Sequence, residues 1–417
     1  MAYTDFIAAI DLGTSHMVGM VGTKNATGAL SIIAYEVENS GTCIRRGCVY
    51  NVKETASKIK RLILKLENKL GGTKIGQVYV GLGGQSLRSI EHTVCKVLGT
   101  EGVVTEEIID SLYQECKDYR PDMLTVLDVV SPSYFLDDKP ESNPVGVPCS
   151  RIEARYKLIV GRPSLKLNIV NSISEQAKIE IAGILVSPLA LGDVVLSDNE
   201  KDLGCALIGF GAGVTTISVY KGGKLASLSV VPFGGNLITK DITNLRVVES
   251  EAERLKITYG SAKADRDNDM TIQVSLADGM GLREIKLAEL NGVIEARMDE
   301  ILENVYARLE ATGLMSVLGA GIVITGGGAA LKNLPAVMSE RLKMEVRYSA
   351  VRKGVVASGD LVVASNPEYA VAVGLLAKGT KNCALYIPPK PEPKIEPVVE
   401  PEPTVEPTPE PEPVKEK

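Results

Sequence analysis

No tryptophan occurs in this 417-residue sequence, and phenylalanine and histidine occur only four times and twice. With His16 and His92 as the only imidazoles, a His-rich metal site and any mechanism that needs several histidines are excluded. Seven cysteines are scattered without a CxxC pair, which is typical of free buried thiols in a reducing cytoplasm. Because aromatic residues are scarce, the hydrophobic cores must be built from Val, Ile, Leu and Ala.

The chain also has no excess of basic charge. The formal net charge is −6, and residues 388–417 alone hold eight Glu against four Lys, or −4. A nucleic-acid binder needs a basic face for the phosphate backbone, so we expect no nucleic-acid partner. The N-terminal segment carries Asp5 and no Lys or Arg, unlike a signal peptide, and no apolar run reaches the length of a membrane span. We therefore expect a soluble intracellular protein.

Glycine, by contrast, is concentrated in two hairpins of the same design. The first has strands over 6–10 and 17–22 around "DLGTSH", and the second has strands over 206–208 and 217–220 around "GFGAGVTT". Turns of this kind let backbone N–H groups approach an anion closely. The repetition predicts two similar halves that face one nucleotide.

The first turn has each part that a phosphate site needs. Asp11 offers a carboxylate for the metal side, Gly13 permits a close turn, and Thr14 and Ser15 offer N–H and hydroxyl donors. The second turn keeps Gly211 and Gly213 but has no carboxylate. Taken alone, either motif can also be an ordinary hairpin with a polar turn.

Two more segments favour a nucleotide site. In "VITGGGAALKNLP" a strand leads into Gly326, Gly327 and Gly328, which would let the chain pass flat against a nucleoside. In "AERLK", Glu253 and Lys256 share one helix face, where they would hydrogen-bond adenine or ribose; an ordinary surface ion pair is the alternative. The occurrence of all four pieces in this order favours one nucleotide site over four unrelated turns.

The remaining pattern indicates an α/β chain with an insertion and a tail. We expect helices over 54–70, 168–182 and 293–313, a half-exposed strand over 151–160, and a last core helix in "PEYAVAVGLLAKG". Residues 85–165 are more polar and contain proline loops, which indicates an inserted subdomain. From Pro388 onward Pro and Glu alternate and hold eleven of the 21 prolines, which predicts an extended, disordered linker.

Together these motifs resemble the superfamily of actin, heat-shock chaperone and sugar-kinase ATPases. Within it, the chain is most similar to the FtsA family of bacterial cell-division proteins. The stretch "NPVGVPCSRIEARYKLIVG" (143–161) resembles part of that family's inserted subdomain, and "NGVIEARMDEIL" resembles its helix used against FtsZ. The resemblance covers residues 5–380. It implies an α/β, two-lobed actin-like (ribonuclease-H-like) ATPase fold with an inserted FtsA-type subdomain, and ATP with Mg²⁺ in the cleft.

The resemblance also implies a division of the chain into subdomains. Lobe I would consist of residues 1–84 and 166–197, interrupted by a self-assembly subdomain over 85–165. Lobe II would have its core in 198–239 and an outer, FtsZ-binding subdomain in 240–305. Residues 306–380 would complete lobe II and return to lobe I, and 381–417 would be the linker. To the nucleotide site the resemblance adds His16, Val214, Thr215, Gly235 and Asn236.

The partners implied by the resemblance are FtsZ, the chain itself and the inner membrane. Arg297 falls where the family contacts the C-terminal tail of FtsZ, with Glu300 beside it; the alternative is a helix-surface Arg paired with Glu300. Filaments would form through residues 85–165. The family reaches the cytoplasmic face of the inner membrane, at the division site, by an amphipathic helix after the linker. No such helix follows Lys378 in this sequence, so we expect either truncation after the linker, which we favour, or anchoring through a partner.

The second hairpin departs from the family pattern Asp-Ile-Gly-Gly-Gly-Thr-Thr-Asp. Aligned through Thr215, it has Gly209 and Thr216 in place of the two acids, Val214 for the first Thr and Ala212 for the middle glycine. His16 stands where a phosphate-facing Lys is common, and Asn143 replaces an Asp of the inserted subdomain. Because hydrolysis needs a carboxylate to order metal and water, we expect ATP to be bound with weak Mg²⁺ dependence and little turnover. Loss of binding altogether is the alternative.

Three other functions compete with a division scaffold. The pilus-assembly actin homologue PilM would share the fold and bind a different peptide. A sugar kinase needs a catalytic base, for which no acid stands out in the second hairpin. A heat-shock chaperone needs a substrate-binding domain, for which no chain remains after residue 387. We therefore expect a scaffold that binds ATP, polymerises and links FtsZ filaments to the membrane.

Overall fold

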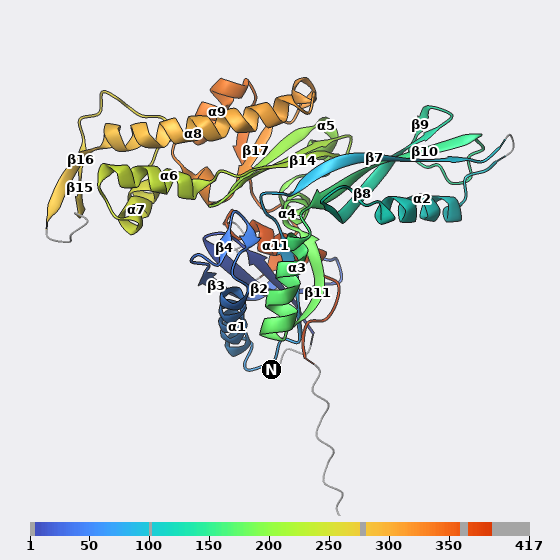
Figure 1. The fold of residues 1–417 in the computed structure, drawn as a ribbon, viewed down its shortest axis with the longest axis horizontal. Helices are drawn as coiled ribbons and strands as arrows, with labels where there is room; N and C mark the ends of the chain where they lie inside the picture. Colours follow the sequence, from blue (N-terminus) through green and yellow to red (C-terminus); the bar gives the residue numbers. More distant parts are fainter. Residues whose placement is uncertain (1–4, 100–101, 276–280, 359–365, 386–417) are drawn as a thin grey trace, which may run out of the picture. The chain divides into compact units, whose positions relative to one another are not determined.

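The structure of this chain is a computed structural model, which describes residues 5–99, 102–275, 281–358 and 366–385 (Figure 1). The expected Pro/Glu linker lies almost entirely outside the described residues. The architecture consists of three main β-sheets with helices packed against them. Each sheet is built mainly from one stretch of the chain, but the first sheet also contains two later strands, β11 and β19.

The first sheet contains the first glycine-turn hairpin at its centre. Strand β1 is apolar and buried apart from Asp11, and it pairs antiparallel with β2 from Ile7↔Gly22 to Leu12↔Met17. Strand β6 runs parallel to β1 on its other side, and β11 runs parallel to β6. The six strands, in spatial order, are β11 (Glu180–Val186), β6 (Gln77–Leu82), β1 (Ile7–Leu12), β2 (His16–Lys24), β3 (Leu30–Asn39) and β19 (Val356–Ser358).

Helices cover this sheet because each presents one apolar stripe. Helix α1 begins at an Asn51 side chain that accepts a hydrogen bond from the Glu54 N–H, and it buries Ile59, Leu62, Ile63 and Leu66. The other helices here are α3, the π-helical η1 that continues it, α4 and α11. Two paired strands of two residues each, β4 and β5, precede α1. Their bounds are β4 (Ile44–Arg45), β5 (Cys48–Val49), α1 (Val52–Lys69), α3 (Ser164–Val170), η1 (Asn171–Ala177), α4 (Ser187–Val195) and α11 (Ala370–Lys378).

The polar region after residue 85 forms a four-stranded antiparallel sheet. The expected half-exposed strand is confirmed, since β10 alternates buried and partly exposed residues from Arg151 until its buried end. Its buried face packs with α2 around Leu112, Cys116 and Tyr156. The elements are β7 (Arg88–Val97), α2 (Glu106–Asp118), β8 (Thr125–Leu136), β9 (Lys139–Glu141) and β10 (Arg151–Gly161), with the strand order β7-β10-β8-β9.

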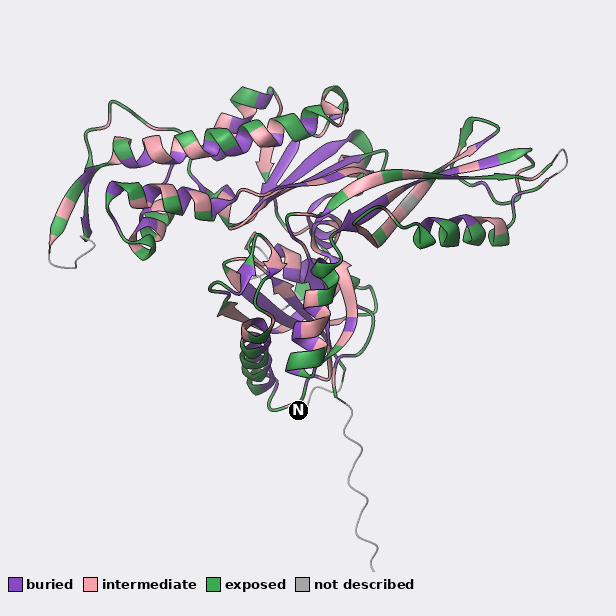
Figure 2. Ribbon diagram, in the orientation of Figure 1, coloured by how far each residue is buried: buried purple, intermediate pink, exposed green. Residues whose placement is uncertain are grey.

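The third sheet repeats the plan of the first. Strands β12 and β13 form the second glycine-turn hairpin, paired from Cys205↔Tyr220 to Phe210↔Thr215, and β17 lies parallel to β12. Most residues of these strands are buried (Figure 2). The order is β14 (Lys224–Val231), β13 (Thr215–Lys221), β12 (Cys205–Phe210), β17 (Ile322–Thr325) and β18 (Val346–Tyr348), preceded by α5 (Asp198–Leu203).

The long helix α8 packs against this sheet and against α6. It buries a stripe that includes Ile294, Met298, Ile301 and Val305, while its other face is exposed (Figure 2). The remaining elements are α6 (Gly235–Ile242), η2 (Thr243–Leu245), α7 (Glu249–Tyr259), β15 (Thr271–Ser275), β16 (Leu282–Lys286), α8 (Leu287–Glu310), η3 (Met315–Val317), η4 (Gly327–Ala330) and α9 (Leu334–Leu342).

Two expected helices have different limits in the structure. The helix expected over 168–182 was wrong at its C-terminal end, because it closes at Ala177, where Lys178 takes a left-handed conformation, and Glu180 starts β11. The helix expected over 293–313 begins earlier, at Leu287. Among the described residues, no helix is both long enough and apolar enough to cross a membrane. The subdomain boundaries proposed from the sequence stay a prediction.

Candidate functional site

Residues of both hairpin turns and of the triple-glycine turn line one cavity, which has a volume of about 360 Å³. This volume lies in the usual range of small-molecule sites. The nucleotide-site residues proposed from the sequence line it, with the exception of Thr215. That side chain is fully buried under the turn, and its hydroxyl donates to the carbonyl of Phe233 at 2.9 Å. The lining residues among those proposed are Asp11, Gly13, Thr14, Ser15, His16, Gly211, Gly213, Val214, Gly235, Asn236, Glu253, Lys256, Gly326, Gly327 and Gly328.

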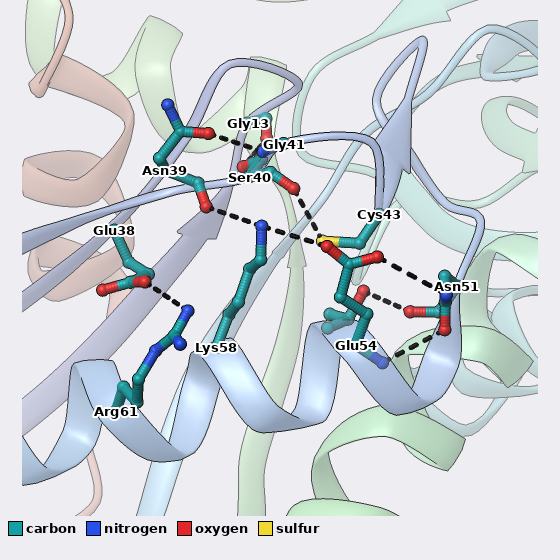
Figure 3. Close-up of polar contacts among 11 residues, drawn as sticks. Gly13, Glu38, Asn39, Ser40, Gly41, Cys43, Asn51, Glu54, Lys58 and Arg61 are labelled. Atoms are coloured by element: carbon teal, nitrogen blue, oxygen red, sulfur yellow. Dashed lines mark hydrogen bonds and ion pairs between the residues drawn. The ribbon is translucent and has the colours of Figure 1, made fainter.

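The first turn is held from behind by the loop after β3. The fully buried Ser40 donates its hydroxyl to the carbonyl of Gly13 at 2.7 Å. Lys58 of α1 in turn donates to the carbonyl of Asn39 at 3.1 Å and pairs with Glu54 (Figure 3). Ser40 therefore fixes the turn through the carbonyl of Gly13, and Lys58 ties the loop that carries Ser40 to α1.

The two hairpin turns meet directly. A Cβ atom on Gly213 would lie 2.7 Å from Thr14 Oγ1 and 3.0 Å from the Cα atom of Arg46. Thr14 Oγ1 also accepts a hydrogen bond from the Gly47 N–H at 2.9 Å. Only a glycine at position 213 permits this approach, so the turn chemistry of the second hairpin is matched to the first.

Asp11 lies at the end of β1 in surroundings that disfavour its charge. Burial raises the pKa of its carboxyl from 3.8 to about 6, against a smaller lowering by a backbone hydrogen bond from Leu12. A Cβ atom on Gly81 of the neighbouring strand β6 would lie 3.1 Å from Asp11 Oδ1 and 2.5 Å from Ser187 Oγ. Asp11 and Ser187 thus face the space that Gly81 leaves open.

The second turn is tied to the start of α6 by backbone bonds. The carbonyls of Gly211 and Ala212 accept from the N–H groups of Gly235 and Asn236 at 3.0 and 2.8 Å. A Cβ atom on Gly234 would lie 2.5 Å from the carbonyl oxygen of Gly211. Gly235 and Asn236 therefore reach the cavity because glycine at 234 lets the helix start against the turn.

Glu253 and Lys256 form the ion pair that their spacing predicts, and both also line the cavity. The Lys256 ammonium donates to Glu253 at 2.6 Å, to Thr239 at 2.8 Å and to the carbonyl of Gly235 at 3.2 Å. The ammonium thus links α7 to the first turn of α6. Beside it, the side chains of Ile257 and Leu331 give this end of the cavity an apolar wall suited to a base.

The triple-glycine turn passes close to β12. Gly326 has a φ of +86°, and a Cβ atom on it would lie 2.6 Å from the carbonyl oxygen of Phe210. A Cβ atom on Gly327 would lie 2.8 Å from Glu368 Oε1. Glycine at these positions therefore lets the turn pass between the end of β12 and Glu368 without a steric clash.

Several lining residues were missed by sequence reasoning, among them Ser187, Glu368, Thr325 and Gly81. Each one lies at a strand end or beside a helix start that becomes adjacent to the turns only through sheet pairing. Thr325, directly before the three glycines, is the one whose place in the sequence carried a signal.

The donor set fits a phosphate better than a metal held by protein carboxylates. At the hairpin turns the carboxylate is Asp11, and the corresponding place in the second hairpin is Gly209. No group of three His, Cys, Asp or Glu side chains in the described part of the chain could hold a metal ion. A divalent cation there would have one carboxylate with a raised pKa, so the residues do not fit a metal bound by the protein itself.

The residues proposed for partner binding lie elsewhere, outside the cavity lining. Arg297 on α8 donates from Nε to Asp241 at 2.5 Å and from Nη1 to Glu300. The guanidinium is partly buried, with a quarter of its side chain exposed. Thus the Arg297–Glu300 pair considered as the alternative is present, and Asp241 joins it.

Comparison with known proteins places the chain in a family. A family model described as "Cell division protein FtsA" matches residues 206–374. FtsA of Porphyromonas gingivalis is 39% identical over 382 residues, which cover 91% of this chain and 79% of that protein. FtsA of Bacillus subtilis is 32% identical over 392 residues, covering 92% and 86%.

Solved structures with the same fold are more distant in sequence. The PilM–PilN type IV pilus biogenesis complex aligns with a TM-score of 0.62 at 16% identity, over 89% of this chain and 97% of that one. MreB5 of Spiroplasma citri bound to ADP gives 0.51 at 14% identity, over 89% and 95%. These likenesses confirm the two-lobed actin-like α/β fold. The identity and coverage of the curated relatives show that this actin-like chain belongs to the FtsA family of cell division proteins.

Proposed function

We propose that this protein is a nucleotide-binding scaffold of cell division, which holds ATP as a structural ligand and hydrolyses it weakly or not at all. The observation that carries the proposal is the convergence of two hairpin turns and a triple-glycine turn on one cavity. Backbone N–H groups in such turns suit phosphates, and the Glu253–Lys256 end with its apolar wall suits a nucleoside. A solved structure with this fold is described as bound to ADP.

Weak hydrolysis follows from the donors at the phosphate end. Asp11 is the carboxylate of the first turn, while the second hairpin has Gly209 and Thr216 in place of carboxylates. Thr14 and Ser15 can bind a phosphate but cannot activate a water molecule. Phosphoryl transfer needs a group that positions the attacking water and metal charge that stabilises the leaving phosphate. We therefore expect binding to be retained and turnover to be slow.

The scaffold role rests on the family. We propose that the chain assembles with copies of itself, binds the C-terminal tail of FtsZ near Arg297, and connects FtsZ filaments to the cytoplasmic face of the inner membrane. Self-association is supported by a filament of the same fold, described as the MamK double helical filament, with a TM-score of 0.51. The membrane connection is proposed from the family alone, and the linker that would lead to it lies almost entirely outside the described residues.

Two measurements on the purified chain test the nucleotide role. Equilibrium titration with a fluorescent ATP analogue should show saturable binding that unlabelled ATP reverses, and phosphate release should stay close to the protein-free background. Absence of binding would overturn the proposal as a whole. Steady phosphate release at kinase-like rates, on the order of 1 per second or more, would overturn only the structural-ligand part.

The partner role is tested by pull-down with the FtsZ C-terminal peptide. We expect the wild-type chain to retain the peptide and Arg297→Glu to lose it, because the variant places a carboxylate beside Asp241 and Glu300. Arg308→Glu is the matched control, since Arg308 is an exposed arginine on the same helix. Equal retention by both variants would remove Arg297 from the peptide site.

A further inference from the structure

Gly209 stands beside two threonines on the neighbouring strands of the third sheet. It pairs with Thr216 of β13 on one side and with Thr325 of β17 on the other. All three residues line the cavity. Because successive side chains of a strand point to opposite faces, Thr215 is buried below the sheet and Thr216 faces the cavity.

The hydroxyl of Thr216 occupies the space above Gly209. A Cβ atom on Gly209 would lie 2.6 Å from Thr216 Oγ1 and 3.8 Å from Thr325 Cγ2. A distance of 2.6 Å leaves no room for a side chain at position 209 while Thr216 keeps its conformation. Gly209 and Thr216 are therefore a matched pair: the Thr216 hydroxyl fills the space that a side chain at position 209 would otherwise occupy.

The hydroxyls of this cavity differ in how they are engaged. Thr14 accepts from the Gly47 N–H, and Ser15 forms a 2.8 Å hydrogen bond with Nδ1 of His16. Thr216 is partly exposed and its hydroxyl makes no hydrogen bond to another residue that the structure describes, whereas Thr325 is buried with its hydroxyl unpartnered. A polar group withdrawn from water without a partner is costly, so a ligand acceptor beside the Thr325 hydroxyl would be stabilised. The Thr216 hydroxyl, which makes no hydrogen bond within the described residues, can donate to the same ligand.

We propose that Thr216 donates a hydrogen bond to a phosphate oxygen of the bound nucleotide and so takes the place of a second carboxylate. The proposal rests on the nucleotide binding proposed above. A hydroxyl donor binds a phosphate oxygen directly, whereas a carboxylate at the same place needs a cation between two negative groups. The Gly209–Thr216 pair thus makes nucleotide binding independent of divalent cations.

The raised pKa of Asp11 agrees with this arrangement. Burial raises that pKa to about 6, so this cavity-lining carboxyl carries its charge less readily than an exposed Asp. A site with hydroxyl donors and one carboxyl of raised pKa repels a triphosphate less than a site with two ionised carboxylates does.

The first test is direct binding of ATP, ADP and adenosine to the full chain, with excess EDTA and with Mg²⁺. We expect wild-type affinity for ATP to change less than about threefold between the two conditions, and Thr216→Val to weaken ATP binding by about tenfold with adenosine unaffected. Valine preserves the shape of threonine. Thr93→Val, at an exposed threonine of β7, is the control and should bind like the wild type.

The outcomes separate this inference from the function beneath it. If the wild type binds none of the three ligands, nucleotide binding itself fails. If the wild type binds ATP and Thr216→Val binds it equally well, or loses adenosine to the same extent, the role of Thr216 is wrong while the nucleotide site stands. Loss of ATP binding in EDTA would overturn the cation independence.

A second variant approaches the pair from the other side. Gly209→Asp combined with Thr216→Ala places a carboxylate in the space that the hydroxyl leaves. We expect ATP binding by this double variant to become dependent on Mg²⁺, with affinity in EDTA lower by about tenfold than in Mg²⁺. Circular dichroism and thermal melting check that it folds. A folded double variant with the same affinity in both conditions would contradict the proposed exchange.

Discussion

Thr14 and Gly213 lie in the turns of hairpins from different sheets, yet a Cβ atom on residue 213 would lie 2.7 Å from Thr14 Oγ1. We therefore expect Gly213→Ala to push the two turns apart and to weaken ATP binding by about tenfold or more, as overpacking of a tight contact does. Titration with a fluorescent ATP analogue measures the effect. Gly83→Ala is the matched control, because Gly83 lines the same cavity and a Cβ atom there would meet nothing within 4 Å. Equal loss in both variants would show that the cavity tolerates no added methyl group anywhere.

Asp11 gives the stability of the ligand-free protein a defined pH dependence. Its pKa in the folded chain is raised from 3.8 to about 6 by burial. Well below pH 3.8 the carboxyl is protonated in both the folded and the unfolded state, and it makes no difference to stability. As the pH rises toward 6 the unfolded chain ionises first, so folding is increasingly penalised, and above pH 6 the penalty is constant.

Asp11→Asn should therefore raise the free energy of unfolding at pH 8 by up to about 3 kcal/mol, but by only about 0.5 kcal/mol near pH 4. Urea unfolding at the two pH values measures the difference. Asp267→Asn, at an exposed residue outside the cavity, should show no such divergence. A uniform shift of Asp11→Asn at both pH values would mean that packing, not charge, causes the change.

Lys256 is expected to stabilise the contact between α6 and α7. Replacing it with Met removes an ammonium that donates to Glu253, Thr239 and the carbonyl of Gly235, with only 12% of its side chain exposed. We expect the free energy of unfolding to fall by about 1–2 kcal/mol. Arg254→Met, which breaks the half-exposed pair with Glu251 on the same helix, should cost less than about 0.5 kcal/mol. Similar losses in urea unfolding for the two variants would contradict the structural role of Lys256.

The sequence predicted the glycine-turn hairpins because their pattern is local. Apolar strands around "DLGTSH" and "GFGAGVTT" specify both the strands and the turns between them. The start of α8 could not be predicted in this way, since "NG" at 291–292 is typical of a turn. In the structure Asn291 lies within the helix, and its side chain accepts from the Ser261 N–H at 2.9 Å. A contact across 30 residues thus overrides the local preference.

The site shows the same division between local and distant information. The turn residues that line the cavity were identified from the sequence. Ser187 was not, because it comes to face Asp11 across Gly81 only after β11 and β1 are placed on either side of β6. The role proposed for Thr216 likewise depends on its register opposite Gly209, which strand pairing sets. The end of the helix expected over 168–182 was misplaced for a related reason. Lys178 adopts the left-handed conformation that usually marks a helix end by a glycine, and here the sequence has no glycine at that position.

Glu300 should compete with an acidic peptide for Arg297. The guanidinium of Arg297 is shared between Asp241 and Glu300, and Glu300 is the more exposed of the two carboxylates, at 46% against 25%. If the FtsZ tail binds at Arg297, Glu300→Gln should strengthen binding by about twofold to fivefold, because it removes a competing charge at an exposed pair. Fluorescence anisotropy of a labelled FtsZ tail peptide measures this change. Glu303→Gln, at an exposed glutamate on the same helix, removes the same charge from the protein without touching the pair and should bind like the wild type. Weaker binding by Glu300→Gln would mean that Glu300 itself contacts the peptide, and an equal gain in both variants would reduce the effect to net charge.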